Sequence, residues 1–239
     1  MSQLTALKKA LATKASPEKA AFFPRFFKTG PGDYGEGDLF LGVTVPDCRS
    51  VARSYKDMPL PETIELLHSQ WHEERLVALM IMVLAFQRAD IASQQAIYKQ
   101  YLANTKFINN WDLVDLSARD IVGKFTYEHQ QELPKLDKLA NSKLLWDRRI
   151  SIIATFYFLQ KGDPAPTLQI AEKLLTDKHD LIQKAVGWML REMGKRVDQQ
   201  LLLDFITQHY SNMPRTTLRY AIEKFSPNTR KKLLSGIFE

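Results

Sequence analysis

Apolar residues recur three or four positions apart along most of the chain, the spacing that places them on one face of an α-helix. The one strand candidate, residues 40–45, stands alone and has no partner with which to form a sheet. We therefore predict an all-α fold with short connections between helices. The expected helices are 2–14, 17–27, 46–57, 61–69, 71–87, 91–103, 110–125, 128–140, 145–161, 166–177, 180–194, 198–209, 214–224 and 227–236.

Serine and proline mark the predicted helix starts. Ser16 is placed to cap the second helix, and Pro17 suits its first turn because proline lacks an N–H that would go unpaired there. Three further prolines are placed to open helices in the same way: Pro46, Pro61 and Pro214. One connection is longer than the rest, because residues 28–38, KTGPGDYGEGD, predict a turn-rich loop near the N-terminus.

The tryptophans reveal an internal repeat. Each belongs to an apolar helix that is followed, after a short turn, by a second amphipathic helix. Helix pairs at intervals of roughly 33–47 residues predict a solenoid of HEAT-like, ARM-type repeats, here a single domain over residues 1–239. An irregular helical bundle is the alternative. A solenoid has a concave groove to which successive repeats contribute, and such a groove suits an extended polymer. The tryptophans are Trp71, Trp111, Trp146 and Trp188.

Charge makes a polyanion the expected partner. The 239 residues include 33 Lys and Arg against 27 Asp and Glu, a net charge of +6 with a pI near 9.3. The longest apolar run, Leu76–Phe86, is shorter than the roughly 20 residues that cross a membrane. No secretory signal is evident, so we expect a cytoplasmic protein without membrane contact. Cys48 is the only cysteine, which excludes an intrachain disulfide and a cysteine-based zinc site.

Two chemical patterns are set aside. Residues 30–35 match G-x-G-x-x-G, but the segment before them reads as helix, whereas dinucleotide binding needs a strand there and a helix after. His68 and His72 are four positions apart, yet no third ligand and no H-E-x-x-H order accompany them. We expect neither a metal nor a cofactor.

Three helices repeat a tryptophan with a charged residue one turn away. The spacing is four positions in the first pair and three in the others, so each pair shares a helix face. A single pair is explained by a tryptophan in the core beside a charge at the solvated edge. Three copies on neighbouring repeats instead predict a shared concave surface with two or three indoles, one carboxylate and two guanidiniums. The pairs are Trp111 and Asp115, Trp146 and Arg149, and Trp188 and Arg191.

This set of groups suits a nucleic acid that carries a cationic centre. Guanidiniums pair with phosphates, and indole faces attract cations and stack on sugars or bases. An ionised carboxylate between them stabilises developing positive charge. Cleavage of the glycosidic bond of an N-alkylated purine has both features, because the base is already cationic and the sugar becomes oxocarbenium-like. Such a base leaves without a general acid, so the paired carboxylates of ordinary glycosidases are not required.

Several motifs resemble the AlkD family of DNA alkylation repair glycosylases, in the same order over roughly residues 38–225. The resemblance implies HEAT-like repeats around a basic concave groove for duplex DNA. It also implies release of cationic 3-alkyladenine and 7-alkylguanine, without flipping the damaged base out of the duplex, by a protein that is nucleoid-associated when bound to DNA. The motifs are FLGVTVPDCR at 40–49, HEERLVAL at 72–79, NNWDLVD at 109–115, WDRR at 146–149, QKAVGWMLRE at 183–192 and LRYAIEKF at 218–225.

The resemblance also assigns roles to individual residues. Asp115 matches the catalytic aspartate, which stabilises the sugar cation and positions water. Trp111 and Trp188 match the indoles that flank the deoxyribose of the lesion. The expected DNA-binding residues are Arg149 near the lesion, Arg191 in the groove, and Arg148 and Lys184 in the same two motifs.

The sequence departs from some members of the family at Asp180 and Leu181, where those members carry aromatic residues near the DNA. The family also contains paralogues that lack the catalytic set, and here that set is complete. A glycosylase that acts as a monomer is therefore the first interpretation. The alternatives are a non-catalytic DNA-binding paralogue and a HEAT-repeat scaffold for a protein or peptide.

Overall fold

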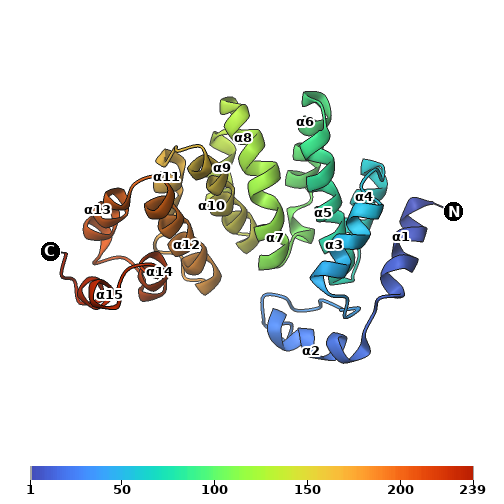
Figure 1. Cartoon of the computed structure of the whole chain (residues 1–239), viewed down its shortest axis with the longest axis horizontal. Helices are drawn as coiled ribbons and strands as arrows, with labels where there is room; N and C mark the ends of the chain where they lie inside the picture. Colours follow the sequence, from blue (N-terminus) through green and yellow to red (C-terminus); the bar gives the residue numbers. More distant parts are fainter. Residues whose placement is uncertain (1, 239) are drawn as a thin grey trace. The chain divides into compact units, whose positions relative to one another are not determined.

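The structure, a computed structural model, describes residues 2–238 and is built from helices joined by turns and loops. Within those residues the only β-type pairing is an isolated bridge between Leu39 and Trp71. The predicted all-α fold class is confirmed. The helices are α1 (Gln3–Ala12), α2 (Pro17–Phe27), α3 (Val45–Ser54), α4 (Leu60–Leu67), α5 (His72–Arg88), α6 (Ile91–Ala103), η1 (Thr105–Phe107), α7 (Trp111–Ala118), η2 (Arg119–Gly123), α8 (Lys124–Glu128), η3 (Gln130–Glu132), α9 (Pro134–Ala140), α10 (Leu145–Gln160), α11 (Ala165–Leu174), α12 (Asp180–Arg196), α13 (Gln199–His209), α14 (Arg215–Ala221) and α15 (Pro227–Leu234) (Figure 1).

The chain divides between Ser117 and Ala118 into two compact units, called unit 1 and unit 2 in chain order. That residues 1–239 form one domain stays a prediction. In unit 1, α5 is the central helix and packs against α3, α4 and α6. Its apolar segment from Leu76 to Val83 is buried on every side, as expected of a helix that is apolar all round, and the four polar residues before it, His72 to Arg75, are buried as well.

Unit 2 is a stack of helix pairs. The helices α10, α12 and α14 pack in succession on one side, and α9, α11 and α13 lie on the other (Figure 1). The three helices of the first row begin at Leu145, Asp180 and Arg215, at intervals within the predicted repeat length. Gly187 permits the close approach of α12 to α14, because a Cβ there would lie 2.5 Å from the carbonyl oxygen of Thr217.

Most predicted helix starts are confirmed. The Ser16 hydroxyl accepts a hydrogen bond from the Lys19 N–H, and Pro17 is the first residue of α2. Pro46 and Pro61 lie in the first turns of α3 and α4. Pro214 differs slightly, because it is the capping residue before α14 and not its first residue.

The strand candidate at residues 40–45 is wrong. Its last residue, Val45, already begins α3, and the residues before it form a loop in which Gly42 has a φ of +78°. The backbone N–H groups of this segment donate to the buried carboxylate of Glu73 on α5, at 2.9, 2.8 and 3.1 Å. A side chain therefore satisfies the donors that a neighbouring strand would satisfy in a sheet. The donors are those of Leu41, Gly42 and Val43.

The boundary between two of the predicted helices lies elsewhere in the structure. The helix expected at 110–125 continues to Glu128, through the π-helical turn η2. The helix expected at 128–140 begins only at Pro134, after the short 3-10 turn η3. The ring of Pro134 fits the first turn of a helix and excludes a continuous helix through that point. In the π turn, Gly123 lies so close to α10 that a Cβ would be 2.2 Å from the carbonyl oxygen of Ala154.

Candidate functional site

Trp111 and Asp115 lie one turn apart on α7 in unit 1, and both are partly exposed. The opposite face of the helix is fixed in the core, where Leu113 and Val114 are fully buried. At the start of α7 the Trp111 N–H donates to the side-chain carbonyl of Asn110 at 2.8 Å. The prediction that the indole and the carboxylate share one helix face is consistent with this placement.

The indole of Trp111 is held by α2. The ring of Phe27 stacks on it, with centroids 5.7 Å apart and planes 20° apart, and Phe26 contacts it edge-on at 5.5 Å and 72°. Phe27 is buried, whereas Phe26 is 55% exposed. Sequence reasoning gave α2 no part in the site, because no local spacing relates residues 26 and 27 to residue 111.

A buried network of charges ties the first turn of α7 to α5. The two ring nitrogens of His72 lie 3.1 Å from a carboxylate oxygen of Asp38 and 2.8 Å from one of Asp112. Asp38 also accepts hydrogen bonds from Arg75 at 2.6 Å and from Asn109 at 3.2 Å. Since both ring nitrogens face carboxylates, the arrangement requires the doubly protonated imidazolium.

Electrostatics agree with that protonation state. Burial disfavours the charged ring, but the carboxylates of Asp112 and Asp38 outweigh it and raise the pKa of His72 to about 9. Burial also opposes ionisation of Asp38, yet His72 and Arg75 hold the pKa of that carboxyl below its ordinary value. The network fixes the position of α7 and, with it, the placement of Trp111.

Unit 2 carries the remaining predicted residues. On α12, Trp188 is partly exposed and lies against the ring of Phe156 from α10, with centroids 6.2 Å apart. Two guanidiniums lie over the same Phe156 ring, that of Arg119 at 5.7 Å and that of Arg196 at 4.9 Å. Sequence analysis did not predict Arg119 or Arg196 as site residues, although each lies over the Phe156 ring that contacts Trp188.

The predicted cations of α12 form ion pairs. The ammonium of Lys184 lies 2.7 Å from Asp180 in the first turn of the same helix. Arg191 pairs with Glu223, which follows α14, and lies 3.6 Å from Glu192. The side chain of Lys184 is 37% exposed, whereas that of Arg191 is 16% exposed.

On α10 the tryptophan is part of the core, and both arginines donate hydrogen bonds to other groups of the protein. Trp146 is 4% exposed, and the neighbouring Arg149 is also buried and donates to the backbone carbonyl of Leu181 at 2.6 Å. Arg148 donates to the Asp177 carboxylate at 2.6 Å and to two carbonyls before α10 at 3.0 and 3.1 Å. Trp146 is therefore not one of the two or three indoles of the predicted surface, because its side chain is part of the core. The DNA contacts predicted for Arg148 and Arg149 remain predictions.

The two patterns set aside have structural explanations. Residues 28–38 are a series of turns after α2, so the G-x-G-x-x-G match opens no helix. His68 and His72 bind different partners, since His68 lies 2.6 Å from the Asn104 side-chain oxygen. Across residues 2–238, no group of three or more histidine, cysteine or acidic residues could hold a metal ion. No helix within those residues is long and apolar enough to cross a membrane.

Comparison with known proteins gives a family match and a structural match. The family model described as DNA alkylation repair enzyme matches residues 7–225. A solved structure titled as a predicted DNA alkylation repair enzyme from Enterococcus faecalis superposes with a TM-score of 0.71 at 19% identity. The match covers 90% of this chain and 98% of that one, and it shows a shared fold of helical repeats. No curated protein matches the chain.

Proposed function

This chain belongs to the family of DNA alkylation repair enzymes, and from that membership we propose that it is a DNA glycosylase of base-excision repair. Its substrates are cationic 3-alkyladenine and 7-alkylguanine in duplex DNA, and it acts as a cytoplasmic monomer. The observation that carries the proposal is the pairing of Trp111 and Asp115 on α7, with the indole held in place by Phe27 of α2.

The proposed chemistry relies on the charge of the lesion. In an N-alkylated purine the C1′–N bond breaks, and its electron pair neutralises the base, which leaves without a general acid. The sugar becomes oxocarbenium-like, and water adds to C1′ and releases a proton. Asp115 stabilises the sugar cation more than the neutral sugar of the ground state, which lowers the barrier. Trp111 and Trp188 match the indoles that, in the family which the motifs resemble, flank the sugar of the lesion.

The proposed DNA contacts fall into two groups. Arg191 and Lys184 hold near-surface ion pairs on α12, where a phosphate can replace the carboxylate partner. Arg148 and Arg149 form the second group, and they contact the DNA backbone from positions fixed by their hydrogen bonds to groups of unit 2. The basic balance of the chain, +6, supports binding to a polyanion.

The test is base release from duplex DNA that carries one defined lesion. We expect release of 7-methylguanine and 3-methyladenine well above the spontaneous rate, and no release of uracil, because an uncharged base needs leaving-group activation. Release of uracil would contradict the charge argument. Duplex binding without release of either methylated base would indicate a non-catalytic DNA-binding protein, and no duplex binding would favour a protein-binding scaffold.

A further inference from the structure

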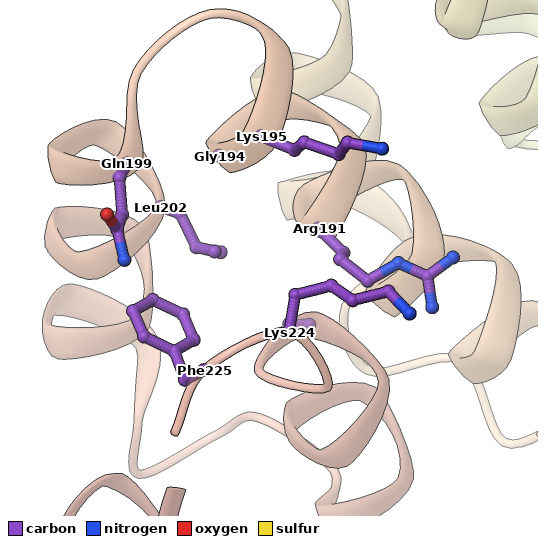
Figure 2. A pocket seen from close by; sticks show the side chains of 8 residues that line it. Arg191, Gly194, Lys195, Gln199, Leu202, Lys224 and Phe225 are labelled. Atoms are coloured by element: carbon purple, nitrogen blue, oxygen red, sulfur yellow. The ribbon is translucent and has the colours of Figure 1, made fainter. Parts of the chain in front are cut away.

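A pocket of about 260 Å³ lies between α12, α13 and α14 in unit 2. Figure 2 shows the side chains of Arg191, Lys195 and Lys224 extending toward one side of it. The other side is lined by Leu202 of α13 and by Phe225 in the turn after α14. Cationic and apolar walls facing one small cavity suit a ligand with an anionic group and an apolar part.

The cationic wall continues the face of α12 that carries Trp188. Lys184, Trp188, Arg191 and Lys195 follow one another at spacings of four, three and four, so they form a stripe along one helix face. Gly194 lies toward α13, where a Cβ would be 2.6 Å from the Leu202 side chain. Of this stripe, Arg191 and Lys195 line the pocket.

A carboxylate already pairs with two of the cations that line the pocket. Glu223 forms ion pairs with Arg191 and, at 3.1 Å, with Lys224. The hydrogen bond from Lys224 and the charge of Arg191 hold its pKa below the ordinary value, so it is an anion at neutral pH. Its side chain is 44% exposed, and so it can swing away into water.

The charges around the pocket leave an excess of cations. The four cations are Arg191, Lys195, Arg196 and Lys224, and the two carboxylates are Glu192 and Glu223. Glu192 lies near Arg191 and accepts a hydrogen bond from Arg196 at 2.9 Å. A phosphodiester accepts hydrogen bonds from a guanidinium in a planar fork and attracts ammonium groups as a point charge. The deoxyribose beside it is the apolar part that a Leu and a Phe side chain can contact.

We propose that this pocket binds one phosphodiester group of the DNA strand, and that Glu223 holds the place of that phosphate until DNA binds. The proposal rests on the proposed function, since it adds Lys195 and Lys224 to the DNA-binding residues. Lys195 lies seven residues beyond Trp188, about 10 Å along α12 at 1.5 Å per residue. A strand advances about 3.4 Å per nucleotide, so the phosphate lies within about three nucleotides of the lesion.

A phosphate-by-phosphate scan tests the proposal. Each phosphate near a single 7-methylguanine is replaced by an uncharged methylphosphonate, and duplex affinity is measured for each replacement. With the wild-type protein we expect one sensitive position within about three nucleotides of the lesion. Lys195→Gln and Lys224→Gln should lower the affinity for unmodified duplex, reduce the salt slope by about one, and abolish the sensitivity at that position. Scans that are the same in variants and wild type would overturn the proposal.

Matched variants separate the pocket from general charge effects. Lys231→Gln removes an exposed cation from α15, and it should leave the scan unchanged. Glu223→Gln should raise duplex affinity severalfold, whereas Glu172→Gln, which removes an exposed carboxylate from α11, should change it far less. Equal effects of the pocket and control variants would contradict a specific contact.

The same variants distinguish this inference from the proposed function. Lys195→Gln and Lys224→Gln should raise the protein concentration needed for half-maximal single-turnover excision of 7-methylguanine, because the pocket anchors DNA, whereas the control Lys231→Gln should excise with the wild-type rate and concentration dependence. Binding of inorganic phosphate that depends on Lys195, together with an unchanged methylphosphonate scan, would show a site for a free phosphate ligand and overturn the DNA assignment. A wild-type protein that neither binds nor excises would refute the proposed function itself.

Discussion

At the scale of single residues, His72 connects three segments of unit 1, because its ring lies between Asp38 after α2 and Asp112 in the first turn of α7. Arg75 completes the group through its own pair with Asp38. Two carboxylates and two cations balance one another in the interior. Such a group stabilises the fold only while each partner keeps its charge, since an unpaired buried charge is costly.

The pKa of His72 therefore predicts how stability depends on pH. Its value of about 9 in the folded protein exceeds the ordinary 6.5 of an unfolded chain. The contribution is fully present below about pH 6.5 and is lost as pH rises through 9, by roughly 3 kcal/mol in total. Urea unfolding of the wild type between pH 6.5 and 9.5 should show this loss, and the less stable His72→Gln variant should show a flatter dependence.

The buried thiol of Cys48 also contributes to the pH dependence of stability, so the measurement needs a control for it. Burial raises the pKa of Cys48 to about 12, so ionisation of this thiol in the unfolded chain also lowers stability at alkaline pH. The comparison is therefore repeated in a Cys48→Ala background. Stability that stays constant from pH 6.5 to 9.5 in that background would contradict the protonated state of His72.

At the scale of elements, α2 is the helix that connects the core of unit 1 to Trp111. Phe27 contacts the indole on one side and the rings of Phe40 and His72 on the other, with centroids 5.2 and 4.6 Å away. Phe26 contacts only the outer edge of the cluster, against Phe27 and the indole. Alanine variants of Phe26 and Phe27 therefore compare an exposed ring with a buried ring of the same cluster.

Phe27→Ala should destabilise the protein by about 3–5 kcal/mol, because it opens a cavity in the aromatic cluster. Phe26→Ala should cost no more than about 1.5 kcal/mol, the worth of an exposed aromatic contact. Thermal or urea unfolding measures both. Under the proposed function, Phe26→Ala should also slow excision severalfold in a folded protein, because Trp111 loses its edge contact. Equal stability losses would contradict the different burial of the two rings.

The sequence predicts elements well and the contacts between them poorly. Helical periodicity identified α5, α10 and α12, and spacing alone placed Trp111 and Asp115 on one face. It could not place Phe27 on Trp111 or His72 between two carboxylates, because these contacts join positions far apart in the chain. It also could not show that Trp146 is buried, since a core and a surface tryptophan at the same helical spacing look alike.

At the scale of the whole molecule, the proposed residues come from both units. Unit 1 supplies Trp111 and Asp115, and unit 2 supplies Trp188 and the cations of α12. The proposed function assigns bond breaking to the first pair and most backbone contacts to unit 2. Loss of the Asp115 carboxylate should therefore slow bond breaking without lowering the affinity for duplex DNA.

Single-turnover release of 7-methylguanine by Asp115→Asn, with duplex affinity measured in parallel, tests the central claim most directly. Asparagine keeps the shape of the side chain and removes its charge. After subtraction of spontaneous depurination, we expect the rate to fall by roughly 10²-fold or more, about 2.7 kcal/mol of barrier. Affinity for undamaged duplex should hold or rise, because a negative charge facing a polyanion is gone. Excision at the wild-type rate would show that Asp115 is an ordinary surface residue of α7 and would contradict the catalytic assignment.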